Sequence, residues 1–227
     1  MGNEEVLNTD LLRNRIMQLE YDDLYVGKVK EIYIEETGKE PPNIDIYYSK
    51  DFIDKSGAYG FNGTIIHFYD EKQGINQAYT ITRGSEIAEK HNKRPEDWAY
   101  NLMGVFVGSN ASQYRAAIDF DDHVTELILR KTNKTNISTS LKKFGLGHSL
   151  GGNLNINIQL ITQRYDNVYT TNPAPPTYYQ LFKIDEEFSD DLIEEFNINQ
   201  SDPTAIYNLD PSALKEFAEE YYKDRGK

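Results

Sequence analysis

The sequence predicts an α/β fold in which a mainly parallel central sheet is flanked by helices. Short runs rich in β-branched and aromatic residues alternate with longer amphipathic stretches. An early pair of strands is followed by helix, strand, helix and strand, the order that builds a layered α/β domain. In addition, a glycine-rich turn joins a short apolar run to a helical stretch at residues 144–156.

The first forty residues predict two helices. Thr9 or Asp10 can cap the first, which carries leucine, isoleucine and methionine on one side. The second ends near Gly38, which is followed by Pro41 and Pro42. We treat residues 1–227 as one domain, with N-terminal helices at 1–40 and a core at 43–227.

The core is expected to begin with strands and to continue with alternating elements. The predicted strands are residues 44–49, 63–70, 78–84, 142–147 and the start of 167–176, which runs into a proline-rich loop. The predicted helices are residues 111–132, 151–165, 178–184, 190–196 and 210–225. Asp210 is the expected cap of the last helix and Pro211 its first residue.

Composition narrows the class of function. A net charge of −13 argues against binding to nucleic acid through a basic surface. The absence of cysteine excludes disulfides, thiolate metal sites and a cysteine nucleophile. No stretch reaches about 18 consecutive apolar residues, so we expect no transmembrane segment. The N-terminus lacks the pattern of a signal peptide, which favours the cytoplasm or export without a cleavable signal.

The turn Gly147-His148-Ser149-Leu150-Gly151 is typical of a nucleophilic serine between a strand and a helix. A serine nucleophile needs an exposed oxygen, a base, and donors for the developing oxyanion. The backbone N–H of Leu150 is the natural first donor, because it lies at a helix N-terminus. Two alternatives are an incidental serine in a glycine-rich turn and a dinucleotide-binding loop, in which the third glycine would stand one residue late.

The segment "GHSLGG" resembles the elbow of the lipase class-three family, the fungal-type triacylglycerol lipases with an α/β-hydrolase fold. "YTITRGSE" (79–86) resembles the strand that supplies a second oxyanion donor, which implies Ser85, and Trp98 would lie in a lid. "NINQSDPTA" resembles the strand end that carries the triad acid, which implies Asp202. The resemblance covers about residues 77–206. It extends to lipase-like domains of Gram-positive bacteria, some fused to type VII secretion modules.

A catalytic histidine has no candidate in the expected place. All four histidines (His67, His91, His123 and His148) precede Ser149, whereas α/β-hydrolases have the order serine, acid, histidine. His123 stands in an acidic patch, for which a metal site and a solvated helix face are the alternatives. Three explanations stay open: a fold that is incomplete at the C-terminus of this chain, a natural homologue without catalysis, and an unusual base.

The resulting expectation is a serine hydrolase of the lipase, esterase or phospholipase kind. It would act on a small-molecule or lipid acyl ester, with Ser149 as nucleophile and no cofactor or metal. This chain alone should be weakly active or inactive, and a missing C-terminal region or a partner domain would supply the base. The alternative is a non-catalytic binding or interaction module that keeps the lipase fold.

Overall fold

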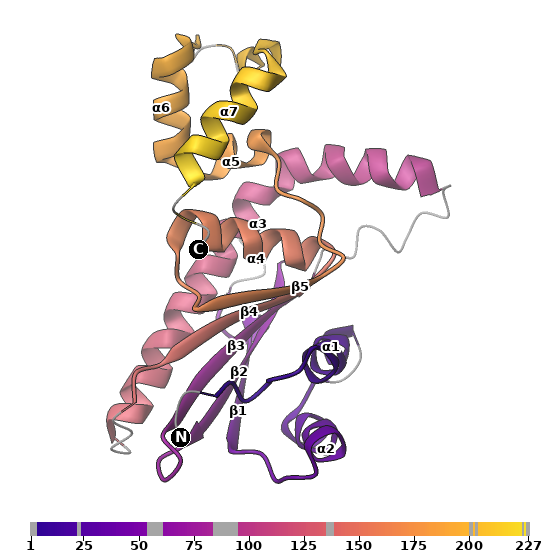
Figure 1. Ribbon diagram of the computed structural model, residues 1–227, viewed down its shortest axis with the longest axis vertical. Coiled ribbons are helices and arrows are strands. Elements are labelled where there is room, and N and C mark those ends of the chain that lie inside the picture. The colour runs from indigo at the N-terminus through magenta and orange to yellow at the C-terminus, as the bar shows by residue number, and fades with distance from the viewer. Residues whose placement is uncertain are drawn as a thin grey trace.

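The computed structural model describes residues 4–21, 24–53, 61–83, 95–134, 139–199, 202, 204–223 and 225, with side chains for all of these except 21 and 95–110. A five-stranded sheet in the order β1-β2-β3-β4-β5 forms its centre (Figure 1). The strands are β1 (Asn43–Tyr48), β2 (Asn62–Asp70), β3 (Ile75–Arg83), β4 (Lys142–His148) and β5 (Asn167–Thr171).

The sheet is mixed. β1 pairs with β2 and β2 with β3 in antiparallel fashion, whereas β3–β4 and β4–β5 are parallel. The expectation of an α/β fold is confirmed, but a mainly parallel sheet is not, because two of the four pairings are antiparallel. The short link between β2 and β3, where Gly74 adopts a φ of 65°, accounts for one of these two antiparallel pairings. A tight link joins antiparallel neighbours, while parallel pairs need crossovers such as those through α3 and α4.

Seven α-helices surround the sheet within the described residues. They are α1 (Asp10–Gln18), α2 (Val26–Thr37), α3 (Pro95–Lys134), α4 (Leu150–Thr162), α5 (Tyr178–Ile184), α6 (Glu186–Phe196) and α7 (Pro211–Tyr222). Short 3-10 turns lie at η1 (Leu19–Tyr21), η2 (Ser49–Asp51) and η4 (Ala205–Asn208). Both N-terminal helices are confirmed, as are the caps Thr9, Gly38 and Asp210.

Two helices are longer than the sequence predicted. The helix expected at 111–132 is the C-terminal part of α3, which begins at Pro95 and has 40 residues. Proline fits the first turn of a helix, where its missing N–H has no partner to lose. α6 begins at Glu186 because Asp185 caps it by accepting a hydrogen bond from the N–H of Phe188, so the acidic run lies inside the helix.

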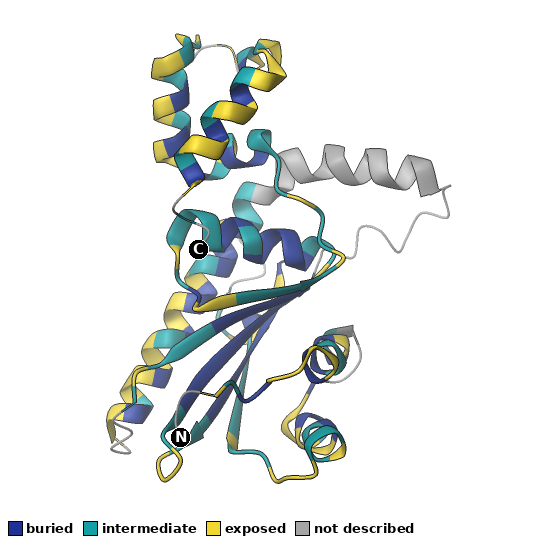
Figure 2. Ribbon diagram, viewed as in Figure 1, coloured by how far each residue is buried: buried dark blue, intermediate teal, exposed yellow. Residues whose placement is uncertain are grey.

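The two faces of the sheet carry different helices (Figures 1 and 2). α1 and α2 cover one face, and α3 and α4 cover the other. Along β4, successive residues face opposite sides of the sheet. Phe144 and Leu146 fill the core under α1 and α2, while Gly145 and Gly147 leave room for Tyr165 and α4 on the other face. Helices α5, α6 and α7 enclose a third apolar core of their own.

Candidate active site

Ser149 occupies a strained turn between β4 and α4. Its φ of 52° and ψ of −114° lie in a region that L-residues rarely adopt. Both main-chain groups are fixed: the N–H donates to the carbonyl of Thr171 (3.1 Å), and the carbonyl accepts from the N–H groups of Asn153 (3.1 Å) and Ala174 (3.2 Å). Such strain costs about 1–3 kcal/mol and persists only where the surroundings enforce it. The residue that the sequence singled out is therefore held in a special conformation.

The glycines around Ser149 are needed for space. A β-carbon on Gly147 would stand 2.5 Å from the carbonyl carbon of Gly151 and from the nitrogen of Gly152. A β-carbon on Gly151 would stand 1.8 Å from the carbonyl oxygen of Thr82, at the end of β3. On Gly152 it would stand 2.9 Å from Cβ of Pro173. The turn thus meets the end of β3 with backbone against backbone, and Gly152 lies against the side chain of Pro173 in the loop after β5.

The N-terminus of α4 begins directly after the serine. Leu150 is the first helical residue, and the first N–H groups of a helix have no intrahelical partner. Together with the helix dipole they favour negative charge at this end. Ser149 and Leu150 are both partly exposed. The arrangement offers a hydroxyl near the surface beside main-chain donors, which are two of the three features that attack on a carbonyl requires, the third being a base.

The end of β3, the strand that the resemblance links to Ser85, lies beside the serine turn. Thr82 is paired with Gly147 in the parallel register, and its hydroxyl donates to the carbonyl of Gly151 at 2.7 Å. Ser85 itself, His91 and the side chain of Trp98 lie outside the described residues. The role of Ser85 as a second oxyanion donor therefore stays a prediction.

Asp202 is in a turn of the C-terminal helical region. The resemblance placed it at a strand end, but the preceding residues 197–199 follow the end of α6 and are not in a strand. Its Oδ1 accepts hydrogen bonds from the N–H (2.8 Å) and the hydroxyl (2.6 Å) of Thr204, and these bonds lower the pKa of its carboxyl. Asp202 is exposed. Its role as a triad acid stays a prediction, and what the structure describes is a local turn contact.

Two of the three described histidines are far from Ser149. His67 is fully buried on β2 with its Nε2 2.9 Å from Oδ1 of Asn76. It pairs with Ala78, which pairs with Lys143, six residues before Ser149. At about 3.3 Å per strand residue this is roughly 20 Å along the sheet.

His123 lies near the same distant end. It is close in sequence to Asp121, whose carboxylate binds the ammonium group of Lys143, and its Nδ1 is 2.7 Å from the carbonyl oxygen of Asp119. The third described histidine, His148, is adjacent to Ser149 in the chain and exposed.

An amide pair under the serine turn was missed from the sequence. Asn153 and Gln180 are buried and face each other across α4 and α5, with nitrogen-to-oxygen distances of 3.3 and 3.4 Å. Gln180 also accepts from the N–H of Thr177 in a capping box. This contact fixes the loop after β5, which includes Ala174, against the elbow helix. Asparagine lowers helix propensity, and the sequence pattern of this helix gives no sign of the contact.

No group of three or more potential metal-binding side chains occurs among the described residues, His123 and its acidic neighbours included. Within the same part of the chain, no helix combines the length and the apolar character needed to cross a membrane.

Comparison with known proteins gives a family. Residues 11–227 match the family described as "Domain of unknown function (DUF6792)". The chain belongs to this family. A curated relative, the uncharacterized protein YvcB of Bacillus subtilis (strain 168), is 32% identical over 253 residues, which covers 100% of this chain and 37% of the relative. The chain thus spans little more than a third of the length of that relative. No solved structure matches the chain.

Proposed function

We propose that this DUF6792 domain is a serine hydrolase for carboxylic esters, with Ser149 as its nucleophile. The observation that carries the proposal is the backbone of Ser149, which is strained and held between β4 and α4 with no room for side chains at the neighbouring glycines. Strained conformations cluster at functional sites. A serine that only linked a strand to a helix would have no need of this conformation.

The chemistry follows from the groups around the turn. The oxygen of Ser149 attacks the ester carbonyl, and its proton passes to a base and then to the departing alcohol. The N–H of Leu150, with that of Ser85 as second donor, stabilises the negative oxygen that forms. Water then attacks the acyl-serine, releases the acid and returns the proton to Ser149. Lipid acyl esters are the substrate class that the lipase-like elbow suggests.

Among the described residues, no side chain is assigned as the base of this reaction. His67 and His123 are too distant, and the sequence holds no histidine after Ser149. We therefore expect this chain alone to turn over esters slowly. Enzymes that lose one triad member keep about 10³–10⁴-fold acceleration over water, from the oxyanion hole and binding. The same observation favours a second candidate, a binding module that keeps the lipase-like turn without catalysis.

Labelling with a fluorophosphonate separates the two candidates. We expect slow labelling of the wild-type chain at Ser149, measured by intact mass and peptide mapping, together with slow hydrolysis of p-nitrophenyl butyrate. Ser149→Ala should abolish both signals. Ser212→Ala, at an exposed serine of α7, is the matched control and should behave as wild type. Labelling that persists in Ser149→Ala would disprove the assignment, and an unlabelled wild type would favour the binding module.

Asp202 is tested by the same reaction. If it orients a base, Asp202→Asn should slow labelling and turnover strongly, since a triad acid is worth about 10⁴-fold in kcat. If Asp202 only stabilises the turn through its hydrogen bonds with Thr204, the variant should react as wild type. Its exposed position and its two hydrogen bonds from Thr204 favour unchanged reactivity. A large loss of reactivity would restore Asp202 to the site.

A further inference from the structure

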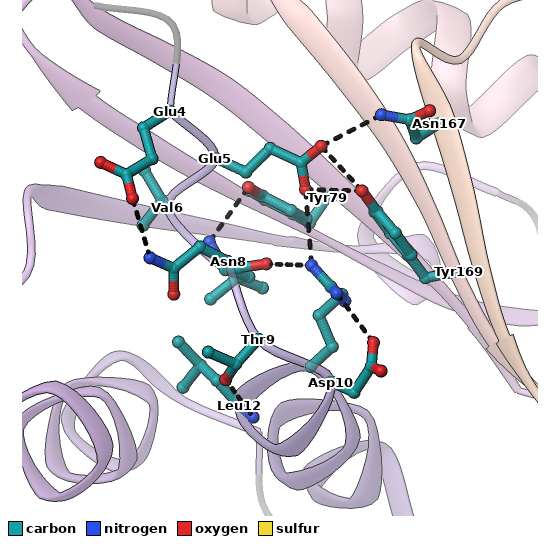
Figure 3. Close-up of polar contacts among 12 residues, drawn as sticks. Glu4, Glu5, Val6, Asn8, Thr9, Asp10, Leu12, Tyr79, Asn167 and Tyr169 are labelled. Atoms are coloured by element: carbon teal, nitrogen blue, oxygen red, sulfur yellow. Dashed lines mark hydrogen bonds and ion pairs between the residues drawn. The ribbon is translucent and has the colours of Figure 1, made fainter. Parts of the chain in front are cut away.

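β5 lies at the edge of the sheet, and its alternate side chains are bound by the N-terminal part of the chain. Its only strand neighbour among the described residues is β4. Asn167 donates from Nδ2 to Glu5 Oε1 at 3.0 Å, and the hydroxyl of Tyr169 lies 2.7 and 2.8 Å from the two carboxylate oxygens of Glu5 (Figure 3). Thr171 donates from its hydroxyl to Asn14 Oδ1 at 2.5 Å. One face of the edge strand is therefore fixed along its length.

Arg13 joins these contacts into one unit. Its guanidinium lies 3.8 Å from the ring centroid of Tyr169 and is 3.5 Å from a carboxylate oxygen of Glu5. It also donates to the carbonyl of Leu7 at 2.6 Å and pairs with Asp10 at 2.8 Å. Arg13 is buried and Glu5 is mostly buried, so the contact between them is partly shielded from water, whereas Asp10 is exposed. The contacts of Arg13 connect α1, the residues before it and β5.

The residues before α1, which we call the N-terminal arm (residues 4–9), are also fixed to the centre of the sheet. The N–H of Val6 donates to Gln77 Oε1 at 2.8 Å. The N–H of Leu7 donates to the hydroxyl of Tyr79, a residue labelled in Figure 3, at 3.1 Å. Both acceptors belong to β3, and both are buried. The arm therefore contacts both the edge strand β5 and the central strand β3.

Thr171 connects this unit to the serine turn. Its hydroxyl binds Asn14 of α1, while its carbonyl accepts the N–H of Ser149. Thr171 is the last residue of β5, where an edge strand has the least support of its own. A shift of this residue would release the bond that fixes the nitrogen of Ser149.

We propose that the N-terminal arm and α1 position the nucleophile turn, and that Asn14 is the positioning residue for Ser149. Asn14 holds Thr171 in place, and Thr171 holds the strained backbone of Ser149. The effect on backbone order stands on the contacts alone. The effect on reactivity rests on the proposed hydrolase function.

The experiment measures amide hydrogen exchange at Ser149 by NMR, together with the rate of fluorophosphonate labelling. The variants are Asn14→Ala, Thr171→Val and the double variant, all in the full chain. We expect each single variant to speed exchange at Ser149 about tenfold, and the double variant to add little, because both remove the same bond. Labelling should slow by a similar factor. Ile66 on β2, in the centre of the sheet, should exchange as in wild type.

Two further variants make the test specific. Asn14→Asp keeps an oxygen acceptor for Thr171 and should restore slow exchange at Ser149. Asn8→Ala removes an asparagine of the N-terminal arm whose side chain binds exposed Glu4, and it should match wild type. Unchanged exchange at Ser149 in Asn14→Ala and Thr171→Val would overturn the proposal, as would an equal rise at Ile66. If no variant is labelled, wild type included, the hydrolase function fails, and the exchange data still decide the positioning role.

Discussion

A β-carbon on Gly151 would stand 1.8 Å from the carbonyl oxygen of Thr82. Because that oxygen belongs to the backbone of β3, no side-chain rotation can remove the clash. We therefore expect Gly151→Ala to destabilise the protein by about 3 kcal/mol or more, at or above the upper end of the usual cost of overpacking. Urea unfolding followed by circular dichroism measures the change.

Gly27→Ala is the matched control for Gly151→Ala. Gly27 lies in α2, and a β-carbon there would meet the Tyr25 ring at 3.0 Å. Tyr25 is an exposed side chain that can move away. Since alanine favours helices over glycine by about 0.5–1 kcal/mol, this variant should be neutral or stabilising. If Gly151→Ala unfolds at the same urea concentration as wild type, as Gly27→Ala is expected to do, the close approach of β3 and α4 is contradicted.

The strain at Ser149 makes a second prediction. Glycine tolerates a positive φ without cost, so Ser149→Gly should be more stable than Ser149→Ala by about 1–2 kcal/mol. Both variants lose the hydroxyl, and their comparison therefore isolates the backbone. Urea unfolding of the pair gives the difference. Equal stability would mean that the turn relaxes in solution and that its conformation carries no argument for function.

Local signals explain what the sequence could predict. The glycines around Ser149 and the apolar run before them placed the strand, turn and helix correctly, because each residue there serves a near neighbour. The start of α3 at Pro95 was missed, since residues 84–102 are mostly polar and the apolar run after them is interrupted by Gly104 and Gly108, which lower helix propensity. The strand expected before Asp202 rested on resemblance, and residues 197–199, the described ones nearest before it, are not in a strand.

Long-range side-chain contacts explain what the sequence could not predict. Glu5 and Tyr169 are 164 residues apart, and Asn14 and Thr171 are 157 apart. Hydrophobic periodicity carries no information about such pairs, because it reports which face of one element is buried. The positioning of Ser149 by α1 therefore becomes visible only once β5 and the N-terminal arm are seen together.

Glu20 makes the last prediction, which concerns pH. It lies in η1, with Oε2 buried and without a hydrogen-bond partner among the described residues. Burial raises the pKa of its carboxyl to about 7, although a hydrogen bond from Thr64 and the charge of Arg83 act in the opposite direction. In the unfolded chain the same carboxyl titrates near its ordinary pKa of 4.5. The folded state therefore holds more protons between these two pH values.

The sign of the pH effect follows from proton linkage. Stability falls with pH wherever the folded state binds more protons, so the Glu20 contribution declines between about pH 4.5 and 7 and is constant above. Glu20→Gln cannot ionise and should remove this decline. The variant should gain stability over wild type as pH rises, by about 1–2 kcal/mol at pH 8 after allowance for partial exposure.

Urea unfolding from pH 4 to 8 measures that difference between Glu20→Gln and wild type. Glu31→Gln, at an exposed position of α2, controls for the loss of one negative charge from a chain of net charge −13. If the difference in unfolding free energy between Glu20→Gln and wild type stays constant with pH, Glu20 has the same pKa in the folded and unfolded states. Glu20 would then be a solvated carboxylate, and the end of β3 beside Ser149 would have no protonated neighbour at neutral pH.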